Sequence, residues 1–288
     1  MIVIIGSIIV LGSVLGGFMM AGGNVSALMH LSEFIIIGGA ALGALVIMSP
    51  AKVIKDLIHS ILASLKGAPY NRKSYEDLFR VLYELFMLGR RNGMIALEEH
   101  VMNPETSSIF TKYPSFANNK PAVEFLCNGL RPVIDGKIKP DQLKMVLEME
   151  MDCMEEEHQH PVDVLSKAAD AMPGFGIVAA VMGIVITMGY ISGEIEEIGH
   201  KVAAALVGTF LGIFISYGFM NPLAVNINFN NASNMTYMRC IASAITGFVS
   251  GMAPMMAVEL ARRSLGSDVR PTADGLETML KEATAGAK

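Results

Sequence analysis

Residues 172–191 read MPGFGIVAAVMGIVITMGYI and contain no charged side chain. A helix of about 20 apolar residues is long enough to cross the hydrocarbon core of a membrane. Three other stretches have the same character, and they lie at 2–21, 28–49 and 202–224. The sequence therefore predicts an all-α, polytopic membrane protein with four transmembrane helices and a helical domain between the second and third.

The basic residues predict how the chain is oriented. Of the 22 Lys and Arg residues, 15 lie between Lys52 and Lys167, and the first 51 residues contain none. Cytoplasmic segments carry the excess of basic residues in membrane proteins. We therefore expect a cytoplasmic loop, two short periplasmic connections at 22–27 and 192–201, and both termini in the cytoplasm of a bacterial inner-membrane protein.

The same reasoning applies to a fifth apolar stretch at 240–258, which Arg239 and Glu259 bound tightly. If this stretch crossed the membrane, the five basic residues after it would face the periplasm and break the charge pattern. We therefore expect one interfacial or cytoplasmic helix here. The chain is therefore predicted to divide into four segments: 1–50 with the first two spans, 51–170 as the cytoplasmic domain, 171–225 with the last two spans, and 226–288 as a cytoplasmic helix and tail.

Helical periodicity in the polar segment predicts four helices. Apolar residues recur at helical spacing over 53–65 and 75–91, and prolines precede two further helices at 121–130 and 141–158. The first of these either extends the second span or lies along the membrane surface. Ser74 and Asp77 resemble a capping box, which would begin the second.

Several function classes find no support in the residues. The net charge of -5 offers no basic patch for nucleic acid. Cys127, Cys153 and Cys240 fit neither a metal motif nor a disulfide framework, so we expect three small buried side chains. His158 and His160 point to different helix faces, so no metal site is expected. No phosphate loop, dinucleotide fingerprint or nucleophile elbow predicts a cofactor or an enzyme.

Each predicted span carries a pair of small residues four positions apart. These pairs are Gly12 and Gly16, Gly39 and Gly43, Ala179 and Gly183, and Gly208 and Gly212. Small residues let two helices approach closely in lipid. The pattern predicts helix packing, within one subunit or against a partner.

Ionisable residues within membrane spans usually mark ion pathways, and here they are scarce. Only His30 and Glu33 qualify, both at the start of the second span, and Glu33 could instead extend to the membrane surface. The third and fourth spans offer only hydroxyls, among them Thr209. If the chain works with ions, a partner must supply the carrier.

Two prolines and a group of charges could have functional roles. Pro173 and Pro222 are predicted at one level, at the cytoplasmic ends of the third and fourth spans. Each could be a hinge or an ordinary helix-end proline. Arg90, Arg91, Glu98 and Glu99 flank a break at Asn92-Gly93 and by themselves suggest a solvated surface.

At this point a family resemblance can be stated. Residues 173–183 (PGFGIVAAVMG) resemble the third span of the MotA family, and 207–213 (VGTFLGI) with 217–219 and 222–224 resemble its fourth. Residues 11–17 (LGSVLGG) are similar to its first span. Arg90, Gly93, Met94, Leu97 and Glu98, followed by Asn103-Pro104, resemble its rotor-facing segment. The resemblance covers nearly the whole chain up to about residue 264.

The resemblance implies a stator subunit of the flagellar motor. It implies a homopentamer around a dimer of MotB, whose aspartate would carry the ion, in an assembly driven by ion-motive force without a cofactor. Arg90 and Glu98 would contact the rotor protein FliG, and Pro173 and Pro222 would couple ion passage to conformational change. Sodium-driven relatives carry threonine at the position of Ala180, so this methyl group, with Thr209 retained, implies a proton-driven motor.

Two other kinds of protein share part of this pattern. An ExbB or TolQ type energiser of outer-membrane processes is related, but those families have three spans, whereas four are predicted here. A passive membrane scaffold or channel subunit belongs to another class, and composition and topology alone leave it open. The aligned prolines and the rotor-type charges favour the stator.

Overall fold

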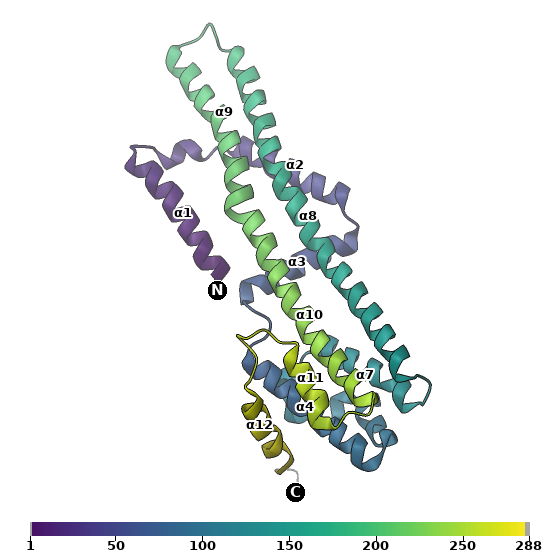
Figure 1. Cartoon of the computed structure of the whole chain (residues 1–288). Coiled ribbons are helices and arrows are strands. Elements are labelled where there is room, and N and C mark those ends of the chain that lie inside the picture. Colours follow the sequence, from purple (N-terminus) through teal and green to yellow (C-terminus); the bar gives the residue numbers. More distant parts are fainter. Residues whose placement is uncertain (1, 286–288) are drawn as a thin grey trace. The chain divides into compact units, whose positions relative to one another are not determined.

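A computed structural model describes residues 2–285 of the chain, and in this range it contains helices joined by turns and loops, without a strand (Figure 1). The chain forms two compact units, each built from two separate stretches of sequence. We call residues 2–67 with 157–230 the membrane unit, and 68–156 with 231–285 the globular unit. Helices α8 (Pro140–Met188) and α10 (Asn221–Val249) each belong partly to both units.

The membrane unit contains the long apolar helices. Its other elements are α1 (Ile2–Met20), η1 (Val25–Leu28), α2 (Leu31–Met48), α3 (Ala51–Lys66), α9 (Ile195–Ile215) and a π-helical turn, η5 (Ser216–Met220). Four stretches in the described range are long and apolar enough to cross a membrane: Ile2–Met20, Val25–Met48, Pro140–Met188 and Ile195–Val249. The prediction of an all-α protein with four spans is confirmed.

The third span is part of a much longer helix than the sequence predicted. The helix expected at 141–158 does not end before the span, because α8 continues for 49 residues. Both Pro161 and Pro173 lie inside it. Proline removes one backbone donor without forbidding helix on either side, and good helix formers such as Ala168 and Ala169 follow Pro161.

Helix α3 is separate from the second span, because Ser49 and Pro50 leave helical geometry between α2 and α3. It buries Leu57 and exposes Ile58 and Leu62. Lys52 at its start donates to Glu157 of α8 over 2.6 Å. The helix therefore does not extend the second span, and its exposed apolar side chains fit the alternative, a membrane-surface helix.

The globular unit surrounds α4 (Arg72–Asn92) with shorter helices. These are η2 (Met94–Leu97), α5 (Glu98–Met102), η3 (Pro104–Thr106), η4 (Phe110–Lys112), α6 (Pro114–Ala117), α7 (Lys120–Ile134), α11 (Pro254–Arg263) and α12 (Ala273–Ala285). Its core joins distant parts of the sequence: Phe86 of α4 stacks on Phe248 of α10, with ring centroids 4.4 Å apart.

Helix α4 begins earlier than the predicted 75–91. Asn71 is the N-cap, and its side chain accepts from the backbone N–H of Ser74 over 3.0 Å. The Ser74 hydroxyl accepts in return from the Asn71 N–H. The prediction of a capping box beginning at Ser74 was wrong, because Ser74 occupies its third helical position while the preceding asparagine caps the helix.

A buried carboxylate anchors the segment after α5. Glu84 of α4 is only 9% exposed and accepts hydrogen bonds from Lys112 Nζ at 2.8 Å and from Tyr113 Oη at 2.6 Å. Burial, and then this bond to Glu84, raises the pKa of the Tyr113 hydroxyl. Glu84 therefore fixes the irregular segment 103–116 to the central helix.

The fifth apolar stretch is not one helix. Helix α10 ends at Val249, Gly251 adopts a φ of 91°, and Pro254 begins α11. A φ of this sign suits glycine and stops a helix. The single helix predicted at 240–258 was wrong, and its apolar residues, such as Ile241 and Ile245, are buried in the globular core.

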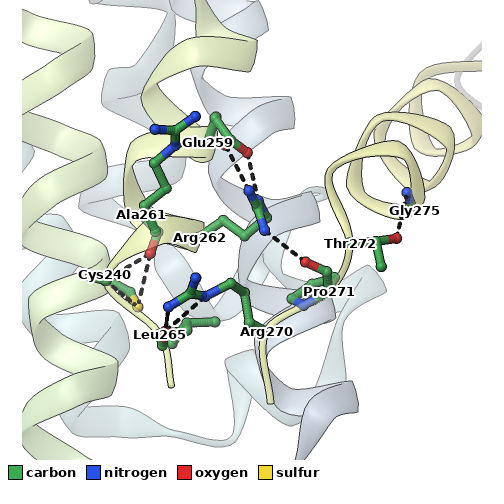
Figure 2. A network of polar contacts seen from close by, with 11 residues as sticks. Cys240, Glu259, Ala261, Arg262, Leu265, Arg270, Pro271, Thr272 and Gly275 are labelled. Carbon is green, nitrogen blue, oxygen red and sulfur yellow. Dashed lines mark hydrogen bonds and ion pairs between the residues drawn. The ribbon is translucent and has the colours of Figure 1, made fainter. Parts of the chain in front are cut away.

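Figure 2 shows the polar contacts that hold the chain after α11. Arg262 donates to both carboxylate oxygens of Glu259, at 2.6 and 2.8 Å, and to the carbonyl oxygen of Pro271 at 2.9 Å. Arg263 also donates to Glu259, over 2.9 Å. The hydrogen bond from Arg262, with the bond from Arg263, lowers the pKa of Glu259 to about 2.

The cysteines are not all buried. Cys127 and Cys240 lie in the globular core, but Cys153 of α8 is exposed. The expectation of three buried thiols was therefore wrong for Cys153, because an amphipathic helix exposes one side and this residue lies on it.

Candidate functional site

Helices α8 and α9 meet backbone to backbone in the membrane unit. A Cβ atom built on Gly212 would lie 2.6 Å from the carbonyl oxygen of Met172, and one on Gly176 would lie 2.8 Å from the oxygen of Gly208. A Cβ on Gly183 would lie 2.7 Å from the Cβ of Ala205. No side chain fits at these positions, so the small residues of the third and fourth spans do pack helix on helix. We call this contact the α8–α9 crossing.

The glycine pairs of the first two spans behave differently. A Cβ built on Gly12, Gly16, Gly39 or Gly43 would meet no other described atom within 4 Å. Helix α1 buries none of its residues. These two small-residue faces are therefore not used for packing within the described part of this chain.

Ala180 and Thr209 both lie at the α8–α9 crossing. Ala180 is buried, and its backbone nitrogen lies 3.4 Å from the Cβ position of Gly208. The Cα atom of Thr209 lies 3.3 Å from the Cβ position of Gly176. The two residues predicted for the ion pathway therefore lie on facing helices of one contact.

Pro173 and Pro222 lie near one level of the membrane unit. Asn221 Nδ2 donates to Asp170 Oδ1 over 3.4 Å, which joins the residue directly before Pro222 to a residue three positions before Pro173. Pro173 lies within α8, whereas Pro222 follows directly on the π-helical turn η5. Such turns occur frequently at functional sites. Helix α8 continues past Pro173, whereas the sequence placed this proline at the end of a span.

One ionisable residue differs from the simplest expectation. Glu33 does not point away from the protein, because only 5% of the residue is exposed. Its Oε2 lies 2.6 Å from the Cβ position of Gly208, at the α8–α9 crossing. The sequence showed that Glu33 was unusual in a span, but only the packing shows that it is buried.

The predicted rotor-facing charges lie in the globular unit, at the adjoining ends of two helices. Arg90 and Arg91 close α4, and Glu98 and Glu99 open α5. All four side chains are exposed. Cations at a helix C-terminus and anions at an N-terminus also suit the helix dipoles. No ion pair joins Arg90 to Glu98 among the described residues.

The connection between these two helix ends is firmly positioned. Gly93 adopts a φ of 84° where α4 stops. Leu97 is fully buried, and a Cβ on Gly89 would lie 3.2 Å from its side chain and 3.1 Å from Phe248. A rigid apolar anchor therefore lies directly beneath the exposed charges.

Comparisons with known proteins agree with this architecture. Residues 4–93 match the family "Motility protein A N-terminal", and residues 117–239 match the "MotA/TolQ/ExbB proton channel family". The chain is 35% identical to motility protein A of Salmonella typhimurium over 277 residues, covering 96% of this chain and 94% of that protein. It is 37% identical to chemotaxis protein LafT of Vibrio parahaemolyticus over 278 residues, covering 96% and 98%.

Two solved structures have the same fold. The C. jejuni MotAB structure matches with a TM-score of 0.77 at 22% identity, covering 94% of this chain and 98% of that one. The flagellar MotAB stator complex of Bacillus subtilis matches with a TM-score of 0.74 at 24% identity, covering 96% and 98%. From both family matches and from the relatives more than 30% identical over nearly its whole length, this chain belongs to the motility protein A family, the flagellar stator subunits of the MotA/TolQ/ExbB proton channel family.

Proposed function

We propose that this stator subunit works with MotB, which supplies the ion-carrying carboxylate, and that the complex converts proton flow into rotation of the flagellar rotor. The α8–α9 crossing carries the proposal. Ala180 and Thr209 lie on its two facing helices, whose apolar stretches, Met172–Met188 and Val202–Ile215, contain no ionisable residue. A pathway along these helices needs a partner's carboxylate.

Coexpression with the cognate MotB in a non-motile host that lacks its own stator tests this function directly. We expect swimming only when both chains are present, and copurification of the two from the inner membrane. A host that stays non-motile, with both proteins inserted and copurifying, would refute the assignment of a working stator pair.

The identity of the ion depends on Ala180. Sodium needs several oxygen ligands in place of its water, whereas a proton can ride on one carboxylate. We therefore expect swimming speed to be insensitive to external sodium and to collapse with a protonophore. Speed that follows the sodium concentration at constant proton-motive force would show that the selectivity lies elsewhere than at Ala180.

Rotor contact is assigned to Arg90 and Glu98, which would meet charged residues of FliG. Reversing either charge should impair rotation while leaving the protein level and membrane insertion unchanged, because exposed charges contribute little to folding. Lys137→Glu, an exposed reversal in the same unit, is the matched control and should swim. A compensating reversal on FliG should restore motion, and normal swimming of both variants would rule out this contact.

Conformational coupling is assigned to Pro173 and Pro222. Pro173→Ala restores a backbone donor inside α8 and should give an assembled complex that does not rotate. Pro161→Ala changes a second proline of the same helix and should still swim. If Pro173→Ala loses assembly while Pro161→Ala does not, Pro173 has a structural role. If Pro173→Ala swims normally, Pro173 does not couple ion passage to movement.

We also propose the topology and stoichiometry. The polar loop and both termini would lie in the cytoplasm, and five copies would surround a dimer of MotB, covering the unused glycine faces of α1 and α2. A cytoplasm-active reporter should work after Lys120 and a periplasm-active one within 193–199. A cytoplasm-active reporter should also work after Lys288, which lies outside the described residues. Periplasmic activity at Lys288 would overturn the topology, and native mass spectrometry would test the number of copies.

A further inference from the structure

Glu33 is an acidic residue enclosed by three helices of the membrane unit. It lies in the first turn of α2 and is 95% shielded from solvent. A carboxylate inside a span is costly unless it is paired, and such residues usually face a functional path. The question is therefore what this carboxyl group contacts.

The carboxyl group lies against the α8–α9 crossing. A Cβ built on Gly208 would lie 2.6 Å from Glu33 Oε2, 3.0 Å from the Ala179 Cβ and 3.4 Å from the Ala180 nitrogen. Only a glycine in α9 leaves room for this oxygen. The carboxyl group is thus adjacent to Ala179 and Gly208, which directly precede Ala180 and Thr209 in the chain.

Glu33 Oε2 has no hydrogen-bond partner among the described residues. Buried polar atoms are almost always paired, so an unpaired one suggests a ligand that comes and goes. The site is too tight for a side chain, as the Gly208 position shows. The smallest possible ligand is a proton.

Few charged groups surround this carboxyl. On its own helix the N-cap residue His30 interacts with it electrostatically, and η1 contributes none. On α9 the charges lie in the first two turns, where Lys201 is occupied by Glu197 at 3.7 Å and by the Tyr190 ring at 3.8 Å. The remaining ones there are Glu196 and His200, and α8 offers none between Met172 and Met188.

We propose that Glu33 is a proton-binding residue of this chain, placed at the α8–α9 crossing beside the pathway assigned to Ala180 and Thr209. A hydronium ion transfers its proton to the carboxylate and leaves as water, and the neutral acid later releases the proton toward the partner's carboxylate. The chain thereby contributes one acidic group of its own. This role rests on the proposed proton conduction.

Infrared difference spectroscopy of the purified complex with MotB in lipid vesicles tests proton binding directly. We expect a carboxylic acid C=O band that appears and disappears as the pH is changed, and that Glu33→Gln abolishes. Glu196→Gln, which removes an exposed acid at the start of α9, should retain the band. A wild-type spectrum without a titrating band that depends on Glu33 would overturn the proposal.

Proton flux into the same vesicles tests the role in conduction. Glu33→Gln should reduce flux by about 100-fold or more, as expected for loss of a positioned proton-transfer group. Glu33→Asp keeps the acid and should retain measurable flux with a shifted pH profile. Flux within about twofold of wild type in a copurifying Glu33→Gln complex would refute a role in conduction.

The two experiments separate this inference from the proposed function. If the Glu33 band titrates but the wild-type complex passes no protons, the proposed function fails and proton binding at Glu33 stands. If the wild-type complex conducts and the band is absent, the inference fails and the function stands. Should Glu33→Gln not copurify with MotB, the pH profile of Glu33→Asp decides, and an unshifted profile contradicts the proposal.

Discussion

Substitution of Gly212 by alanine is the most direct test of the α8–α9 crossing. The new Cβ would lie 2.6 Å from the carbonyl oxygen of Met172 and 3.0 Å from the Cα of Gly176. Both obstacles are backbone atoms, which cannot rotate aside as the end of a side chain can. The two helices must therefore separate for the methyl group to fit.

The size of the effect follows from two opposing contributions. Replacing glycine by alanine within a helix favours folding by about 1 kcal/mol. Overpacking typically costs about 1–3 kcal/mol, and a backbone obstacle places the cost near the upper end. We expect Gly212→Ala to lower the free energy of unfolding by about 1–2 kcal/mol as the net result.

Gly39→Ala provides the matched control, because a Cβ there would meet nothing described within 4 Å. In the isolated chain it should be neutral or stabilising, by at most about 1 kcal/mol. Thermal unfolding of the detergent-purified chain without MotB, followed by far-ultraviolet circular dichroism, compares the two variants. If Gly212→Ala unfolds at the same temperature as Gly39→Ala, the close backbone contact between α8 and α9 is refuted.

Three further predictions concern the globular unit. Glu84→Ala should lower the free energy of unfolding by about 2 kcal/mol, because it removes two hydrogen bonds to a buried charge. Glu76→Ala, which removes a partly exposed ion pair on the helix surface, should lower it by about 0.5 kcal/mol or less. Chemical denaturation measures both variants, and equal losses would contradict the anchoring role of Glu84. The stabilisation from Glu259 is present above the ordinary carboxyl pKa of 4.5 and is lost as the pH falls toward about 2. In Glu259→Gln the free energy of unfolding should therefore fall less steeply in this acidic range when it is measured against pH. An unchanged acidic slope would argue against the ion pair. A thiol reagent near neutral pH should modify exposed Cys153 and spare Cys127, because burial raises the pKa of the Cys127 thiol to about 11. Mass spectrometry of the labelled peptides measures both reactions. Rapid labelling of Cys127 would place that thiol outside the core.

The sequence alone predicted the number and type of the membrane spans. Apolar runs of sufficient length are a local property, and the backbone must satisfy its hydrogen bonds within each helix in lipid. Motifs at 173–183 and 207–213 also predicted the family correctly, because they are contiguous in the chain.

Helix boundaries in the polar segment were predicted less well. Helix α8 extends through 49 residues, although the sequence predicted a helix at 141–158 and a separate span at 172–191. The cap of α4 is Asn71, not Ser74. Local signals of this kind compete over a few residues, and packing of the whole helix decides which one defines its end.

Partners in space were decided only by the tertiary structure. The four small-residue pairs look alike in sequence, yet Gly208 and Gly212 meet α8 while Gly12 and Gly39 meet nothing described. The apolar stretch after Arg239 is buried in the globular core, and Glu33 is enclosed where its composition allowed a surface position. Composition determines only that an apolar segment avoids water, either in lipid or in a protein core. Which helix face covers which side chain depends on contacts between residues far apart in the chain, and no local pattern encodes these contacts.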